Sequence, residues 1–175
     1  MGNPSTSTAS KVQMPMSHML ARWGLCLVGT VLSIYALYVE TSKESNPDYT
    51  AMCDIGKSIS CSKVFTSKYG RGFGIVGSIL GERHILNQPN SIFGILFYIL
   101  QVVIGQTHTL SATNFLIMTS ILSNFGSVYL AYILVVVLED ACLVCISTYI
   151  VNALLLAVNI LKWTHLRRTL TKKAE

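Results

Sequence analysis

The most chemically informative residues of this chain are two cysteines separated by two residues, in the stretch "EDACLVCIS" at 139–147. They follow two carboxylates and open a segment, 141–161, that has no charged residue. A thiol at the N-terminal end of a helix lies at the positive end of the helix dipole, which lowers its pKa and makes the thiolate available. Cys142 and Cys145 therefore predict disulfide chemistry.

A second pair, Cys53 and Cys61, lies upstream in a more polar stretch, and three kinds of site could use the four cysteines. Paired ligands of a structural zinc ion usually have about two to four intervening residues, which "CDIGKSISC" exceeds. Two static disulfides could instead staple a loop. A CxxC at a helix start suits thiol exchange better than a permanent staple, so a redox site without metal is favoured. Cys26, in an apolar run, is expected to be a packing residue.

The composition indicates the membrane as the setting of this chemistry. The chain has 175 residues, of which 51% are hydrophobic, and its mean hydropathy is +0.53. The uncharged run 91–138 is too long for one span and suits two, with a turn in "GQTHTLS". Because a backbone in lipid must satisfy its own hydrogen bonds, we predict an all-α, integral membrane four-helix bundle. Its helices are expected near 20–40, 89–106, 111–138 and 140–162.

The distribution of charge predicts the orientation. An even number of spans places both termini on one side, and the basic tail, 163–175, is expected to stay in the cytosol. The loop 41–89 would then be a luminal cap, and all four paired cysteines would face an oxidising compartment. The last residues, "KKAE", resemble a dilysine retrieval signal of endoplasmic-reticulum membrane proteins.

The two ends of the chain complete the predicted organisation. Residues 1–18 are rich in Ser and Thr and are expected to be a disordered tail, ahead of a transmembrane domain at 19–162. The first helix could be a cleaved signal peptide, but it lacks a small-x-small cleavage site, so an uncleaved anchor is expected. The net charge of +5 is explained by topology and does not indicate nucleic acid.

Helical spacing adds a phenol to the CxxC. Cys142, Cys145 and Tyr149 follow i, i+3, i+7 and share one helix face, with Tyr149 one turn deeper than Cys145. A dithiol with a phenol beneath it, inside a bundle, suits reaction with a lipid-soluble electron carrier.

Four ordered motifs carry a resemblance to a known family. "CDIGKSISCSKVF", "GRGFG", "LNQPNSIFG" and "CLVCISTY", spread over residues 53–149, resemble the vitamin K epoxide reductase family. "NQPNS" and "YLAYIL" are nearer to the vitamin K epoxide reductase-like branch of that family.

The resemblance implies a role for each cysteine. Cys145 would be the nucleophile toward the quinone or epoxide, and Cys142 would be its resolving partner. Cys53 and Cys61 would form a shuttle, in which Cys61 exchanges with Cys142 while Cys53 meets a luminal thioredoxin-like reductant of the protein disulfide isomerase type.

The resemblance also implies a substrate pocket. Two residues, Asn90 and Tyr149, would hydrogen-bond the oxygens of the naphthoquinone head group. The apolar wall would include Phe65, Phe93, Phe97, Leu130 and Leu134. Coumarin anticoagulants would be expected to bind in the same pocket, and no tightly bound cofactor is implied, since electrons come from protein dithiols.

The sequence thus predicts a membrane thiol oxidoreductase that reduces vitamin K epoxide and vitamin K quinone. Two alternatives remain open at this stage. One is a quinone-linked thiol oxidase that forms disulfides with the same cysteines. The other is a non-catalytic, four-span scaffold protein with a stapled loop.

Overall fold

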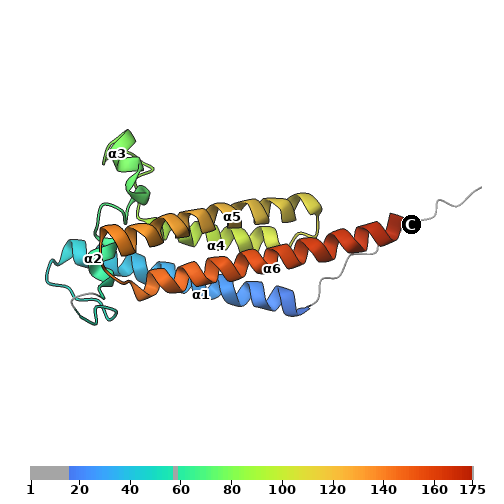
Figure 1. Ribbon diagram of the computed structural model, residues 1–175, viewed down its shortest axis with the longest axis horizontal. Coiled ribbons are helices and arrows are strands. Elements are labelled where there is room, and N and C mark those ends of the chain that lie inside the picture. The colour runs from blue at the N-terminus through green and yellow to red at the C-terminus, as the bar shows by residue number, and fades with distance from the viewer. Residues whose placement is uncertain (1–15, 57–58, 175) are drawn as a thin grey trace, which may run out of the picture.

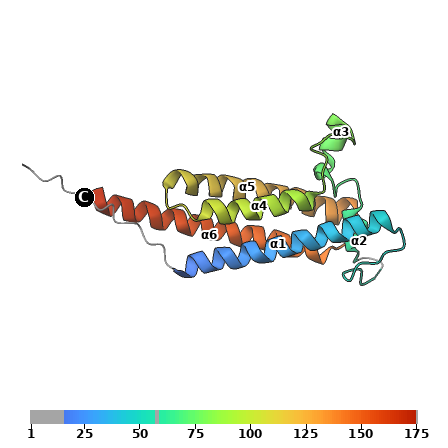
Figure 2. The ribbon, with the colours of Figure 1, turned by 180° about the vertical axis from the view of Figure 1, so that it is seen from behind.

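The computed structural model describes residues 16–56 and 59–174, and this part of the chain is helical, with no β-strand. The prediction of an all-α protein is confirmed. Four long helices lie side by side along the longest axis (Figures 1 and 2): α1 (Met16–Ser45), α4 (Asn90–Gly105), α5 (Leu110–Tyr132) and α6 (Leu143–Ala174).

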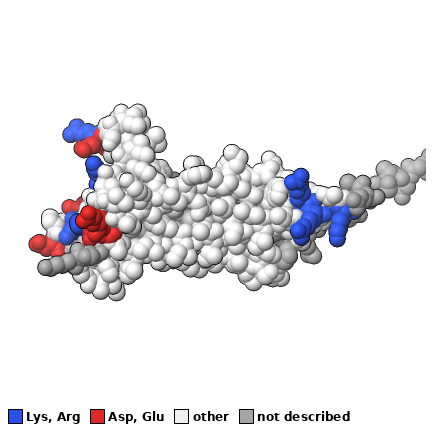
Figure 3. Space-filling model, in the orientation of Figure 1, with Lys and Arg blue, Asp and Glu red and all other residues white. Residues whose placement is uncertain are grey.

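Among the described residues, three stretches of helix are long and apolar enough to cross a membrane: Met16–Ser45, Leu110–Val137 and Leu143–Lys172. The fourth long helix, α4, is apolar but shorter. On the face shown in Figure 3, basic and acidic side chains gather at the two ends of the molecule, and the middle carries neither. A band free of charge is what a protein segment in contact with lipid requires.

The predicted helix boundaries agree best for α4, whose observed ends differ by one residue from the predicted ones. The first helix begins earlier, at Met16, so residues 16–18 of the expected tail form its first turn; residues 1–15 lie outside the described part of the chain. The last helix continues to Ala174, well past the apolar run. The residues after 162 are mostly good helix formers with no Gly or Pro, so hydropathy ends there before the helix does.

Small and polar residues hold the helices together inside the bundle. Gly29 of α1 lies against the ring of Tyr98 of α4, and a Cβ at this position would collide with that ring. The Tyr98 hydroxyl donates to Asn152 Oδ1 of α6 (2.8 Å), and Asn152 Nδ2 donates to Ser127 Oγ of α5 (2.9 Å). Close approach at small residues and hydrogen bonds between helices are how helices associate in membranes.

Two buried cations cap the short helix α4. Its 16 residues correspond to about 24 Å, less than the roughly 30 Å of a bilayer core. Arg22 Nη2 donates to the Gly105 carbonyl (2.6 Å), and Lys162 Nζ donates to the carbonyls of Gly105 (2.9 Å) and Thr107 (2.7 Å). Both cations are at most 3% exposed. They satisfy carbonyls that would otherwise lack partners where α4 ends.

The remaining short elements come between α1 and α4 in the sequence. They lie at the end of the bundle opposite the C-terminus (Figure 1). They are α2 (Cys61–Phe65), the 3₁₀ helix η1 (Gly72–Gly74) and α3 (Val76–Leu80). From here on, "the cap" means residues 69–80 only, which are one part of the loop 41–89. The redox motifs quoted above therefore gather at one end of the bundle, because the CxxC precedes α6 at that same end.

The hydrogen bonds of Arg22 and Lys162 at the end of α4 lead to a prediction about stability. Lys162→Met should lower the free energy of unfolding by about 1 to 3 kcal/mol, because the Thr107 carbonyl loses its donor and Gly105 loses one of two. The measurement is thermal unfolding of the purified protein in detergent. Lys172→Met, which removes an exposed charge from the end of the same helix, is the control and should leave stability unchanged. Equal stability of both variants would show that Lys162 only snorkels.

Candidate functional site

A cavity of about 1060 Å³ opens between the long helices and the cap. It is the size of a site for a lipid-soluble small molecule, and its wall is mainly apolar. Every residue that the sequence assigned to the substrate pocket lines this cavity: Asn90, Tyr149, Phe65, Phe93, Phe97, Leu130 and Leu134. Phe73 of the cap stacks on Phe93 of α4, with ring centroids 6.0 Å apart, so the cap forms one wall of the cavity.

The CxxC stands where α6 begins. Cys142 directly precedes the helix, its carbonyl accepts from the Ile146 N–H (3.0 Å), and its Sγ accepts from the Cys145 N–H (3.3 Å). This is the arrangement of a helix N-cap, with sulfur as the acceptor. The hydrogen bond from the Cys145 thiol is the main cause of a lowered pKa of Cys142; burial opposes it, and backbone N–H groups of Cys145 and Val144 assist it. Cys142 is thus the more readily ionised sulfur in a helix-terminal setting.

A break in the helix precedes the CxxC and sets its position. After α5 the chain passes through the π-helix η2 (Ile133–Val137), and Glu139 then adopts a left-handed backbone conformation, with φ of 51°. Left-handed non-glycine residues and π-helices are both uncommon and occur often at functional sites. The turn reverses the chain so that Cys142 opens a new helix at the end of the bundle.

The two sulfurs of the CxxC lie in different surroundings. Cys145 lines the cavity together with Tyr149, one helical turn away. Cys142 does not line it and is fully buried in an apolar cluster that also contains Cys53 and Cys61. The four cysteines therefore meet at one end of the bundle, and the CxxC connects the cavity with the loop pair.

The loop cysteines form a disulfide, with Cα atoms 5.8 Å apart, while Cys142 and Cys145 are free thiols. The Tyr35 hydroxyl of α1 lies 3.7 Å from Cys53 Sγ and holds the disulfide against the bundle. Two static staples would need a second disulfide. The pattern among the described residues is instead one disulfide, Cys53–Cys61, and a CxxC with two free thiols.

Asp54 organises the turn between the loop cysteines. Its carboxylate accepts hydrogen bonds from the backbone N–H of Ala51 (2.9 Å) and Ser62 (3.1 Å) and from the hydroxyls of Ser60 (3.0 Å) and Ser62 (2.7 Å). Burial alone would raise the pKa of Asp54, but these hydrogen bonds, led by the Ser62 hydroxyl, lower it overall. The ionised carboxylate is therefore part of the folded loop.

A short backbone contact joins the loop pair to the CxxC. Ile59 and Ala141 form an isolated parallel bridge, in which the Ser60 N–H donates to the Ala141 carbonyl (3.1 Å). Ser60 and Ala141 immediately precede Cys61 and Cys142. The bridge therefore brings these two cysteines alongside each other.

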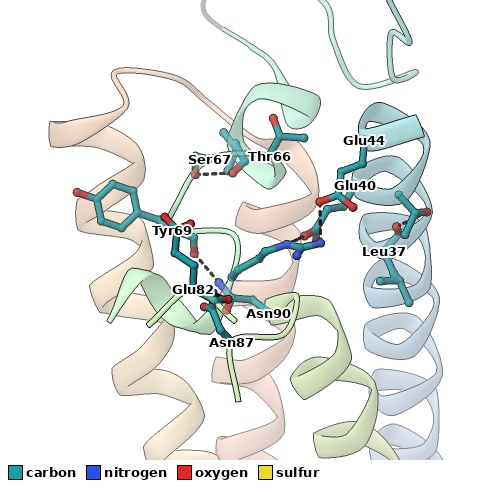
Figure 4. A network of polar contacts seen from close by, with 12 residues as sticks. Leu37, Glu40, Glu44, Thr66, Ser67, Tyr69, Glu82, Asn87 and Asn90 are labelled. Carbon is teal, nitrogen blue, oxygen red and sulfur yellow. Dashed lines mark hydrogen bonds and ion pairs between the residues drawn. The ribbon is translucent and has the colours of Figure 1, made fainter. Parts of the chain in front are cut away.

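Asn90 holds the cap with its side chain, as Figure 4 shows. Its Nδ2 donates to the Tyr69 carbonyl (2.6 Å), and its Oδ1 accepts from the Phe73 N–H (2.9 Å). Pro89, not Asn90, is the N-cap of α4. The Asn90 side chain therefore does not cap the helix but faces the cap segment and lines the cavity.

A second tie between cap and bundle escaped the sequence analysis. Arg71 Nε donates to Glu40 Oε1 (2.8 Å) and Arg71 Nη2 donates to Glu44 Oε1 (2.6 Å), which joins the cap to the end of α1 (Figure 4). Glu40 is 2% exposed and lines the cavity. The partners lie far apart in the sequence. The available signal was Glu40, an acidic residue at the end of an apolar run, and such a residue is equally typical of a helix end.

Comparison with known proteins identifies the class of protein that this site belongs to. A sequence model described as "Vitamin K epoxide reductase family" matches residues 20–160, so the chain belongs to that family. The chain is 50% identical over 141 residues to vitamin K epoxide reductase complex subunit 1 of Rattus norvegicus, covering 81% of this chain and 88% of the relative. It is 49% identical over 143 residues to the protein of the same name from Mus musculus, covering 82% and 89%.

Family membership confirms the resemblance drawn from the four motifs and makes the chain an oxidoreductase. The interpretation as a non-catalytic scaffold is therefore wrong. The match begins within α1 and ends within α6, so it covers all of the helices that surround the cavity.

The lowered pKa of Asp54 makes a prediction about pH. A depressed folded pKa stabilises the loop above the ordinary carboxyl pKa of about 3.9, and this stabilisation is lost as the pH falls through the lower folded value. The protection of the Ala51 and Ser62 amides from hydrogen exchange, taken relative to the intrinsic exchange rate at each pH, should therefore stay high from neutral pH to about pH 4 and fall below it. Asp54→Asn should show low protection of these amides already at neutral pH.

Asp48→Asn removes an exposed carboxylate from the same loop and is the matched control. It should keep the wild-type protection. If Asp54→Asn also keeps it, the carboxylate does not order the turn.

Proposed function

We propose that this chain reduces vitamin K 2,3-epoxide to vitamin K and vitamin K quinone to its hydroquinone in the endoplasmic reticulum membrane. The observation that carries the proposal is the arrangement of the CxxC, with Cys145 in an apolar cavity beside Tyr149 and Cys142 in the cysteine cluster of the loop. Relatives with about 50% identity bear the name of this activity.

The chemistry balances with the thiols that the chain provides. Reduction of the epoxide converts two thiols to a disulfide and releases the epoxide oxygen as water. Reduction of the quinone also converts two thiols to a disulfide, and the two electrons and two protons go to the hydroquinone. Cys145 is proposed as the nucleophile toward the substrate, and Cys142 as the thiol that resolves the resulting adduct by forming the Cys142–Cys145 disulfide.

Asn90 and Tyr149 are proposed to donate hydrogen bonds to the substrate oxygens, where negative charge develops during reduction. Asn90 Nδ2 carries two N–H groups, and the Tyr69 carbonyl uses one of them. The second is available for a ligand in the cavity. Phe65, Phe93, Phe97, Leu130 and Leu134 would contact the apolar part of the substrate, and coumarin-type inhibitors would use the same wall.

The loop pair is proposed to return electrons to the site. A soluble dithiol cannot enter lipid, whereas the Cys53–Cys61 disulfide lies beside α2, at the end of the bundle opposite the C-terminus (Figure 1). A luminal thioredoxin-like reductant would reduce Cys53–Cys61, and Cys61 would then exchange with Cys142.

The proposed topology follows from charge and helix packing. Four spans, with α4 completed by its buried caps, would place both termini in the cytosol and the cap in the lumen. The basic side chains Arg167, Arg168 and Lys172 gather at the end opposite the cap, which supports this orientation.

The relay can be separated from the active site by the choice of reductant. Cys53→Ala and Cys61→Ala should lose turnover with a protein reductant but keep much of it with a small membrane-permeant dithiol, which can reduce Cys142–Cys145 directly. Cys145→Ala should be inactive with both. Turnover of vitamin K epoxide by the purified variants is the measurement, and equal losses for all three variants with the small dithiol would indicate a shared structural role.

The substrate hydrogen bonds can be tested with Tyr149→Phe, which keeps the ring and removes the hydroxyl. The loss of one hydrogen bond to developing charge in a dry site should cost about 1.5 to 3 kcal/mol, or roughly ten- to a hundredfold in turnover. Tyr129→Phe, at another tyrosine of the cavity wall, is the control and should have little effect.

Asn90 needs a more careful variant, because its side chain also holds the cap. Asn90→Asp keeps the acceptor for the Phe73 N–H but removes the donors, so it should lose turnover more than it loses thermal stability. Near-normal turnover of both Tyr149→Phe and Asn90→Asp would show that these residues do not contact the substrate oxygens.

A further inference from the structure

An ion pair links the shuttle helix α2 to the segment that leads into the CxxC. Lys63 Nζ contacts Asp140 Oδ2, which adds a side-chain link to the backbone hydrogen bond between Ser60 and Ala141. The two links flank the cysteines in sequence. Lys63 is two positions after Cys61, and Asp140 is two positions before Cys142.

The two partners of this ion pair differ greatly in exposure. The Asp140 side chain is 1% exposed, whereas the Lys63 side chain is 62% exposed. A carboxylate removed from water needs a counter-charge or hydrogen-bond donors. Lys63 is the one cation that forms a salt bridge with Asp140 among the described residues. Asp140 is therefore a fixed, buried anchor, to which a residue of the loop attaches from the solvent side.

We propose that the Lys63–Asp140 ion pair is a latch that positions Cys61 against Cys142 for disulfide exchange inside the protein. The inference rests on the proposed relay and assigns its internal step to a specific contact. Lys63 and Asp140 act as positioning residues, since neither touches the reacting sulfurs in the contacts described above.

The step served by the latch is a balanced thiol–disulfide exchange. After substrate reduction, Cys142 and Cys145 are joined by a disulfide, and the loop pair has been reduced. The Cys61 thiolate attacks the Cys142 sulfur, so the Cys61–Cys142 bond forms while the Cys142–Cys145 bond breaks. Cys145 leaves as a thiolate with the electron pair, ready for the next substrate. Cys53 then attacks Cys61 and releases the Cys142 thiolate.

The exposed position of Lys63 suits a latch that must also open. An ion pair with one solvated partner can break and re-form. The cost of leaving the buried Asp140 carboxylate without its counter-charge then favours the return of Lys63 to the same contact. The loop can then present Cys53 to a soluble reductant and return Cys61 to the same register.

The test measures how strongly the fold brings Cys61 and Cys142 together. In the Cys53→Ala/Cys145→Ala background of the full chain, equilibration with reduced and oxidised glutathione allows Cys61 and Cys142 to pair with each other. Oxidised glutathione takes up the two electrons. The equilibrium constant is the effective concentration of the two thiols, determined by alkylation and mass spectrometry. Asp140→Asn and Lys63→Met should each lower it by about three- to tenfold, the range expected for a partly exposed ion pair with one buried partner.

Glu139→Gln is the matched control, because it removes an exposed carboxylate from the neighbouring position. It should leave the effective concentration unchanged, and the reversed pair Lys63→Asp/Asp140→Lys should recover part of the loss. An unchanged value in both single variants, an equal loss in Glu139→Gln, or no recovery in the reversed pair would overturn the latch. Lys63→Met changes an exposed side chain, so the test stands even where Asp140→Asn fails to fold.

The measurement involves no quinone, so it is independent of the proposed function. A lowered effective concentration in Lys63→Met and Asp140→Asn, together with no turnover of vitamin K epoxide by the wild-type protein, would keep the latch and refute the proposed substrate. Normal turnover with an unchanged effective concentration would refute the latch alone.

Discussion

The N-cap of α6 is the contact on which the rest of the site depends. Cys142 caps the helix with its sulfur, lies in the same buried cluster as the loop disulfide, and stands three residues before the thiol that faces the cavity. A sulfur held by helix N–H groups is stabilised as a thiolate, which is both a good nucleophile and a good leaving group. One helical turn thus joins the buried loop disulfide to the apolar cavity.

The cap and the helix bundle enclose this turn through buried polar contacts. Arg71 ties the cap to buried Glu40 at the end of α1, and Asn90 ties it to the start of α4. Glu40 and Asn90 both line the cavity. Deeper in the bundle, Tyr98 and Asn152 link α4 to α6. Each group buried in this way needs its partner in place, so the contacts define one arrangement of the helices around the cavity.

The sequence predicted those features that depend on local spacing. The CxxC at a helix start, the shared face of Cys145 and Tyr149, and the extent of α4 follow from periodicity and hydropathy, and the structure agrees with each. The pocket residues came from the family resemblance, and they do line one cavity.

Contacts between distant positions could not be predicted from one sequence. Arg71 with Glu40 and Lys162 with Gly105 each depend on where the chain returns, which hydropathy does not reveal. In the sequence, Lys162 follows an apolar run, and a lysine at such a place looks the same whether it is buried or lies at the membrane interface. The same limit applies to Asn90, because its contacts with Tyr69 and Phe73 are seen only in the folded structure.

The difference between the two CxxC sulfurs indicates which part of the protein has to move during turnover. Cys145 faces the cavity and Cys142 lies in the cluster of the loop cysteines, so in the proposed relay electrons cross from one environment to the other within a single turn of α6. The long helices need no rearrangement for this step. In the proposed relay, motion is required where the loop pair meets first a soluble partner and then Cys142. Cys53 and Cys61 are buried with Cys142 in one apolar cluster, so a soluble reductant reaches them only after the loop opens locally. The links that have to release are those of the five-residue helix α2, which include its ion pair with Asp140.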